Sequence, residues 1–132
     1  MVRQRKDTPA ALVEEFAREV ASQTDAIWRG DAKTGNKHAK RYVRAFRKLR
    51  STGDSGREAL VPLLDHERPD VRVAAAAHLL RYCTTEAMAV LREAAQGNGQ
   101  AAFEASEAIK RWQEGTWALD PAADIEGQEF SS

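Results

Sequence analysis

The sequence predicts an all-α fold built from short antiparallel helix pairs, and three observations support this. Alanine, the strongest helix former, fills 24 of the 132 positions, whereas Val, Ile and Thr together fill 18. Apolar residues recur at intervals of three and four, the spacing of one helix face. A helix-pair pattern also repeats along the chain: Leu63 aligns with Leu91 and Leu79 with Ile109, so the offset drifts from 28 to 30 residues.

Two helices are expected in the first 50 residues. Thr8 is a suitable N-cap, and Pro9 suits the first helical position, where its missing N–H costs nothing. Gly30 ends this helix. The second is expected over about 33–50, although Gly35 and Asn36 leave open a start near Asn36.

Two more helices are expected over the middle of the chain. Ser55 and Glu58 have the spacing of a capping box, which predicts the start of the third helix at Ser55. Pro62 interrupts that helix and is expected to kink it. The fourth follows Pro69 and is expected to run as far as Tyr82, with its apolar face turned inward.

The last two helices complete the predicted set. The fifth is expected to start at Thr84 or Thr85 and to end at Gln96. The sixth follows a Gly-Asn-Gly turn at 97–99 and is stopped by Gly115. All the connections are short, which favours antiparallel neighbours.

The segment over residues 58–82 combines a proline within an apolar stripe, an Asp after it and an Arg in the next helix. These positions are Leu60, Pro62, Leu63, Leu64, Asp65, Pro69, Val71, Arg72, Ala74, Ala75 and Leu79. In them the segment resembles a HEAT repeat. The resemblance implies a kink at Pro62 and a polar ladder between repeats that involves Asp65 and Arg72. It also implies a short HEAT/armadillo-like α-α superhelix of about three helix pairs.

Four features stand out over residues 10–120: the opening LVEEFAREVASQ, a polar second helix, the stretch ALVPLLDHERPDVRVAAA and a closing Trp-rich segment. In these features the chain resembles a family of small bacterial proteins of unassigned function that fold as short HEAT-like superhelices. Genes of this family often lie beside polymorphic toxin genes, and some members look like immunity proteins. The resemblance therefore implies a bacterial protein that neutralises a cognate toxin by direct occlusion.

The chain is expected to comprise three parts: a flexible basic N-terminus over 1–7, one helical domain over 8–117 and an acidic tail over 118–132. A single cysteine, Cys83, excludes an internal disulfide and suits a reducing compartment. No apolar stretch follows the basic start, and none reaches the ~20 residues that span a bilayer. A cytoplasmic location without membrane contact is therefore expected.

The net charge is zero, but its distribution is uneven. Residues 1–66 carry a charge of +5 and residues 67–132 carry −5, and the stretch 29–50 holds nine bases and one acid, Asp31. Like charges at positions i and i+4, such as Lys40 and Arg44, repel by about 0.2–0.5 kcal/mol in an isolated helix. Opposite charge nearby would offset this repulsion. It could come from acids of the first helix, from the acidic tail, or from an acidic protein or nucleic-acid partner.

No motif in the sequence predicts a catalytic, metal or cofactor site. The glycines of the stretch 30–37 are spaced like those of a phosphate loop, but Asn36 interrupts the motif and the preceding element is a helix rather than a strand. The soft ligands His38, His66, His78 and Cys83 lack the spacing of a metal site. His78 and Cys83 are interpreted as packing residues. A binding protein that is not an enzyme and uses no cofactor is therefore expected.

The second helix of each pair normally lines the binding surface of a solenoid. Trp117 is open to two interpretations, a partner anchor or a cap over the end of the last helix pair. The alternatives to toxin neutralisation are a nucleic-acid-binding HEAT-like domain, which zero net charge makes less favourable, and a generic protein-interaction scaffold. The predicted partner-binding residues are Lys40, Arg41, Arg44, Arg47, Lys48, Arg81, Glu104, Glu107 and Trp117.

Overall fold

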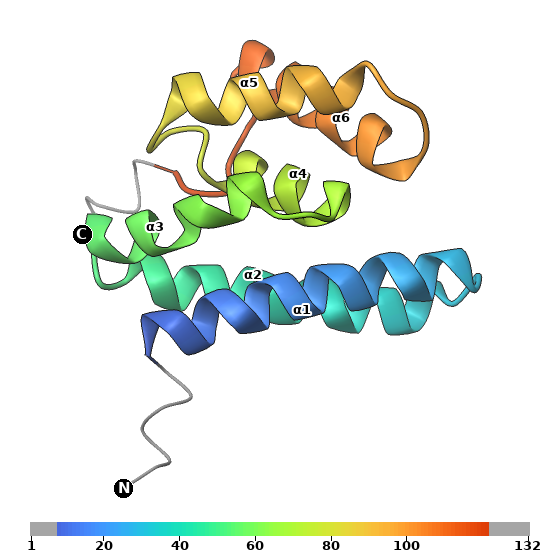
Figure 1. Cartoon of the computed structure of the whole chain (residues 1–132), viewed down its shortest axis with the longest axis horizontal. Helices are drawn as coiled ribbons and strands as arrows, with labels where there is room; N and C mark the ends of the chain where they lie inside the picture. The colour runs from blue at the N-terminus through green and yellow to red at the C-terminus, as the bar shows by residue number, and fades with distance from the viewer. Residues whose placement is uncertain (1–7, 122–132) are drawn as a thin grey trace, which may run out of the picture.

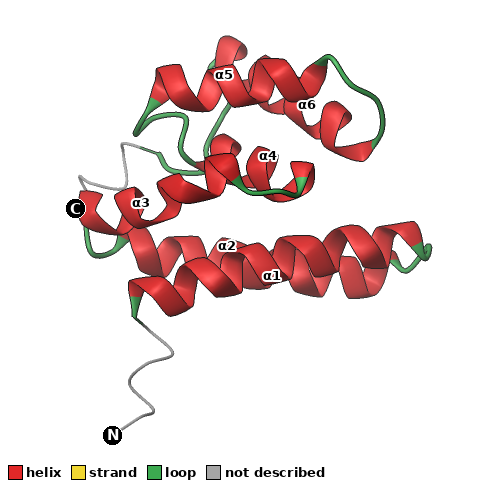
Figure 2. Cartoon of the chain, in the orientation of Figure 1, coloured by secondary structure: helices red, strands yellow, loops and turns green. Residues whose placement is uncertain are grey.

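Residues 8–121, which the computed structural model describes, form six α-helices and one 3-10 helix and contain no β-strand (Figure 2). The predicted all-α class is thereby confirmed for this part of the chain. The expected flexible basic N-terminus over 1–7 and most of the expected acidic tail, from residue 122 onward, lie outside the described residues.

The first two helices form a long antiparallel hairpin, α1 (Pro9–Trp28) and α2 (Ala32–Arg50) (Figure 1). The Thr8 side chain caps α1 as expected and accepts a hydrogen bond from the Ala11 N–H at 3.1 Å. Asp31 caps α2 by accepting one from the Thr34 N–H at 3.1 Å. This cap sets the start of α2 at Ala32, before the Gly-Asn pair that left its start open.

The third helix, α3 (Asp54–Leu60), starts differently from the prediction. The capping box was wrong. Gly53 takes a φ of +87° and begins the helix ahead of Ser55, whose hydroxyl donates back to the Thr52 carbonyl at 3.4 Å. The Glu58 carboxylate accepts a hydrogen bond from the Tyr82 hydroxyl at 2.6 Å and so serves tertiary packing.

The helix changes its winding near Pro62, where a kink was expected. α3 gives way to a 3-10 helix, η2 (Val61–Asp65), with Pro62 in its first turn. The polar ladder implied by the HEAT resemblance does not form as expected. Arg72 donates to the carbonyls of His66 at 2.8 Å and Glu67 at 3.3 Å, while Asp65 is exposed.

Three helices follow, α4 (Pro69–His78), α5 (Thr84–Ala95) and α6 (Gln100–Glu114). The expected extension of α4 to Tyr82 was wrong, because the helix ends at His78 and Leu79 and Leu80 are buried in the turn beyond it. Gly115 ends α6 with a left-handed φ of +80°, as the sequence predicted.

The helices lie in three stacked layers, each made of two helices. α3 and α4 form the middle layer, between the α1–α2 hairpin and the α5–α6 pair (Figure 1). α4 contacts α1 on one side and both α5 and α6 on the other, so it is the centre of the core. The largest fully buried apolar side chains come from all these layers. They are Phe16, Phe46, Leu49, Leu60, Val71, Leu79, Leu80 and Leu91.

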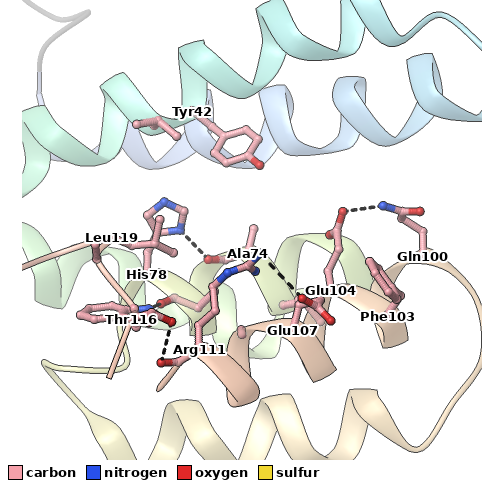
Figure 3. A pocket seen from close by; sticks show the side chains of 16 residues that line it. Tyr42, Ala74, His78, Gln100, Phe103, Glu104, Glu107, Arg111, Thr116 and Leu119 are labelled. Carbon is pink, nitrogen blue, oxygen red and sulfur yellow. Dashed lines mark hydrogen bonds and ion pairs between the residues drawn. The ribbon is translucent and has the colours of Figure 1, made fainter. Parts of the chain in front are cut away.

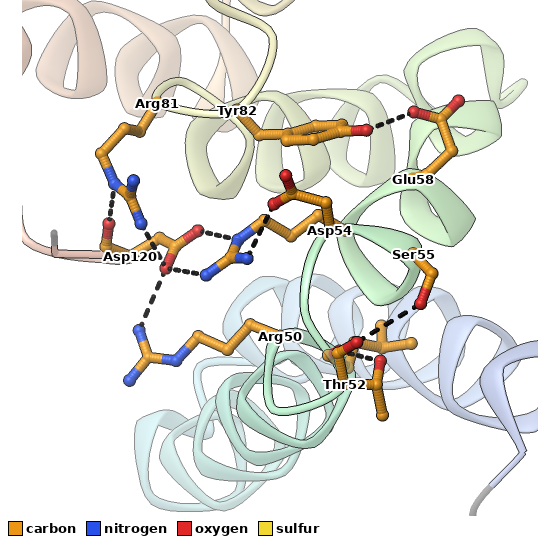
Figure 4. A network of polar contacts seen from close by, with 10 residues as sticks. Arg50, Thr52, Asp54, Ser55, Glu58, Arg81, Tyr82 and Asp120 are labelled. Atoms are coloured by element: carbon orange, nitrogen blue, oxygen red, sulfur yellow. Dashed lines mark hydrogen bonds and ion pairs between the residues drawn. The ribbon is translucent and has the colours of Figure 1, made fainter. Parts of the chain in front are cut away.

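Residues 115–121 form a non-helical segment, here called the strap, that returns across the layers to the region around α3 (Figure 1). Its carboxylate Asp120 is only 1% exposed. The Arg57 guanidinium donates to it from Nε at 2.6 Å and from Nη2 at 3.1 Å. Arg81 and Arg50 approach the same Oδ1 atom at 3.2 and 3.4 Å (Figure 4). Ordered packing thus extends beyond residue 117, where the expected domain ends.

Candidate functional site

A groove of about 650 Å³ lies between α2, α4, α6 and the strap (Figure 3). Its floor is apolar, with Val73, Ala74 and Ala77 from α4 and Ala108 from α6. The run of alanines in α4 explains the open space above this floor, because their small side chains let α6 approach without filling the groove. The volume lies within the ~300–1,000 Å³ typical of binding sites. We call this feature the central groove.

The α6 wall carries the charged groups of the central groove. The Glu104 carboxylate is half-buried and accepts a hydrogen bond from Gln100 Nε2 at 2.7 Å. Burial raises the pKa of Glu104, and the negative charge of Asp70 raises it further. Glu107 lies 3.7 Å from Arg111, one turn away on the same helix. Phe103, on the same wall, is 62% exposed.

The α2 wall is formed by Tyr42 and Val43. The Tyr42 hydroxyl donates to Gln23 Oε1 at 3.3 Å. Burial raises the pKa of Tyr42 to about 12, with a further contribution from the negative charge of Glu104. Tyr42 and Glu104 therefore lie within electrostatic range, and Figure 3 shows them on opposite walls.

His78 also lines the central groove and is 4% exposed. Its ring packs edge-on against Phe16, Tyr42 and Phe46, with centroids 4.9–6.0 Å apart. Burial lowers the pKa of His78 to about 4, so the ring is neutral at pH 7. Nδ1 lies 2.8 Å from the Ala74 carbonyl and is therefore the protonated nitrogen. Within the described residues, Nε2 is left as a buried acceptor without a partner.

The basic residues predicted on α2 are exposed, and none of them lines the central groove. We call Lys40, Arg41, Arg44, Arg47 and Lys48 the basic row. Arg41 lies 3.7 Å from the Glu19 carboxylate of α1, one of the internal acids that the sequence suggested. Arg47 lines a smaller cavity of about 200 Å³ beside the strap. The basic row is therefore separate from the central groove.

Two other predicted residues are engaged within the protein. Arg81 Nε donates to the Asp120 carbonyl at 2.6 Å, so its guanidinium turns toward the strap. The Trp117 indole donates to the Ala77 carbonyl at 2.8 Å and packs edge-on against Trp112, with centroids 5.1 Å apart. This packing is that of a cap over the last helix pair, although Trp117 also borders the central groove.

Three residues that line the groove are not among the site residues predicted from the sequence: Tyr42, Gln100 and Phe103. Tyr42 continues the apolar stripe of its helix, a pattern that indicates a core residue. The sequence does contain an indication for Phe103. It follows Ala102 and lies off the apolar helix face formed by Ala102 and Ala105. A large aromatic residue at such a position is exposed and indicates a contact surface.

The described residues offer little to support metal or thiol chemistry. Between residues 8 and 121, no three His, Cys, Asp or Glu side chains are grouped closely enough to hold a metal ion. Burial raises the pKa of the Cys83 thiol, which disfavours the reactive thiolate. None of the helices in this range combines the length and the apolar composition that crossing a membrane requires.

Comparison with known proteins returns no matching family model, no matching curated protein and no matching solved structure.

Proposed function

We propose that this chain is a short HEAT-like superhelix that binds a partner protein through the face formed by α2, α4 and α6. The observation that carries the proposal is the central groove, which is lined by the second helix of each antiparallel pair. An apolar floor with an exposed aromatic side chain at its wall is typical of a protein contact surface. The layered helix pairs and the break at Pro62 support the superhelix.

The partner that we propose is a cognate bacterial toxin, neutralised in the cytoplasm by direct occlusion. The resemblance to immunity-type proteins supports this choice. The basic row supports it as well, because exposed guanidinium groups steer an acidic partner and can grip carboxylates in pairs. A generic interaction scaffold would use the same face with a different partner.

The experiment reverses the basic row and measures protection. Lys40, Arg44 and Arg47 are replaced together by Glu, and Arg41 is retained because it neutralises the buried Glu19. The variant and the wild type are expressed with the toxin domain encoded beside this gene. We expect cell survival and complex formation to be lost while the helical circular dichroism spectrum is unchanged.

A matched control carries the same charge change on exposed bases outside the basic row, with Lys33, Arg92 and Lys110 replaced by Glu. We expect this control to protect cells as well as the wild type does. If the triple variant of the basic row also protects fully, the basic row is not part of the interface. If no toxin lies beside the gene and none is neutralised, the immunity role is wrong.

A nucleic-acid-binding function is the second candidate, and the basic row is the observation that favours it. Each phosphate contact would add about 0.9 to the slope of log affinity against log salt on duplex DNA. We expect only weak binding that disappears near physiological salt. Tight, salt-resistant binding of a defined oligonucleotide would replace the protein-partner proposal with this one.

A further inference from the structure

Glu104 differs from the buried carboxylates of this protein in its surroundings. Glu19 lies 2.6 Å from His38, Asp70 lies 2.9 Å from Arg68, and Asp120 is held by arginines. In residues 8–121, Glu104 accepts one hydrogen bond, from the neutral Gln100, and forms no ion pair with a base. A half-buried carboxylate without a counter-ion is unfavourable, unless a ligand supplies the positive charge.

The groups around Glu104 in the central groove are suited to a cation. Across the groove lies Tyr42, whose oxygen can accept a hydrogen bond while its proton is donated to Gln23 (Figure 3). Phe103 presents an exposed ring next to the carboxylate, and aromatic faces attract ammonium and guanidinium groups. His78 also borders the central groove, and its neutral ring adds no charge that would repel a cation.

An anionic ligand fits this groove poorly. The basic group that lines it is Arg111, which lies 3.7 Å from Glu107. The field at Glu104 is made more negative by Asp70. An acidic side chain in the groove would therefore meet like charge, whereas the apolar floor formed by Ala74, Ala77 and Ala108 suits a chain of methylene groups.

We propose that the central groove receives a lysine or arginine side chain of the partner protein, with Glu104 as counter-ion to its head group. Tyr42 and Phe103 flank the cation, and the alanines of α4 and α6 contact its methylene groups. This inference rests on the proposed protein-binding function and assigns a chemistry to its central contact. The partner thus offers a base to the groove and acids to the basic row outside it.

The test uses N-acetyl-lysine amide as the probe, titrated into the isotopically labelled full chain and followed by amide chemical shifts. N-acetyl-norleucine amide is the uncharged control of similar shape, and N-acetyl-glutamate amide is the anionic control. We expect the lysine probe to shift the amides of α4 and α6 that line the groove, and the norleucine probe to bind roughly tenfold more weakly.

The variant Glu104→Gln keeps the size and polarity of the side chain and removes its charge. We expect it to weaken binding of the lysine probe by roughly tenfold, because the ion pair forms in a partly desolvated groove. Glu93→Gln, at an exposed position on α5, is the matched control and should leave the affinity unchanged. Glu104→Gln should not lower the melting temperature, since the charge that it removes lacks a counter-ion among the described residues.

Three results would overturn the proposal. The lysine and norleucine probes could bind equally, the glutamate probe could bind best, or Glu104→Gln could change the affinity by less than about twofold, within the range of a surface contact. The outcome is separable from the proposed function. Loss of probe binding with intact toxin protection rejects this inference alone, and probe binding without protection of cells rejects the immunity role alone.

Discussion

Replacing Asp120 by Asn should destabilise the fold more than the same replacement at an exposed aspartate does. The side chain is 1% exposed and accepts hydrogen bonds from Arg57 at 2.6 and 3.1 Å and from Arg81 at 3.2 Å. Removing one member of a buried charge cluster typically costs about 3–5 kcal/mol. The guanidinium groups keep some contact with water, so we expect about 2–3 kcal/mol here.

Thermal unfolding followed by circular dichroism measures this loss. A chain of this length has an unfolding entropy near 0.28 kcal/mol per kelvin, so the expected fall in melting temperature is about 7–11 °C. Asp54→Asn is the matched control, since Asp54 also bonds Arg57 at 3.0 Å but is 77% exposed. Exposed pairs contribute less than about 1 kcal/mol. Equal melting temperatures for the two variants would refute the buried cluster.

The same cluster predicts a dependence on pH. Burial acts to raise the pKa of Asp120, but the hydrogen bonds and charge of Arg57, with Arg81 and Arg50, lower it below its ordinary value. A lowered folded pKa means that the stabilisation is present above the ordinary value, near 3.9. It is lost as the pH falls through the lowered pKa. The stability difference between wild type and Asp120→Asn should therefore be constant at neutral pH and shrink below about pH 4.

Two further predictions follow from buried positions. Gly56→Ala should destabilise by several kcal/mol, about as much as an overpacked core position, because the new Cβ would lie 1.7 Å from the Leu49 carbonyl oxygen. Gly97→Ala, whose Cβ would have only an ordinary contact at 3.5 Å, should be nearly neutral in chemical denaturation. The imidazole of His78 should stay neutral in NMR titrations until about pH 4, and stability should fall as the pH drops from 6.5 to about 4. A His78 signal titrating near 6.5 would contradict its burial.

The helices could be predicted from the sequence because their causes are local. The N-cap at Thr8, the helix stop at Gly115 and the interruption at Pro62 each depend on a few neighbouring residues, and the structure confirms them. The wrong predictions also concern local features, at positions where two sequence patterns favour different structures. At the start of α3, a glycine with positive φ overrode the Ser55 capping box. At the end of α4, the apolar pattern continued past His78 although the helix did not.

The site was harder to predict because its parts are distant in the chain. Asp120 and its partners Arg50 and Arg57 are separated by 70 and 63 residues, and no periodic pattern links them. Helical periodicity ends at Gly115, so the strap looked like the start of an acidic tail. The residues of the basic row are exposed, but charge alone could not show that Tyr42 and Val43 form the groove wall.

The strap also has a consequence for how the chain folds and unfolds. A linear array of helix pairs has contacts only between neighbours, so its ends can fray independently. Here Asp120, at the end of the described chain, bonds Arg50 at the end of α2. Opening the α5–α6 pair would pull the strap away from the first hairpin and break that bond, which couples both ends into one cooperative unit. During synthesis on the ribosome, the bond between Asp120 and Arg50 can form only after residue 120 has emerged. The earlier helix pairs therefore form before the strap is in place.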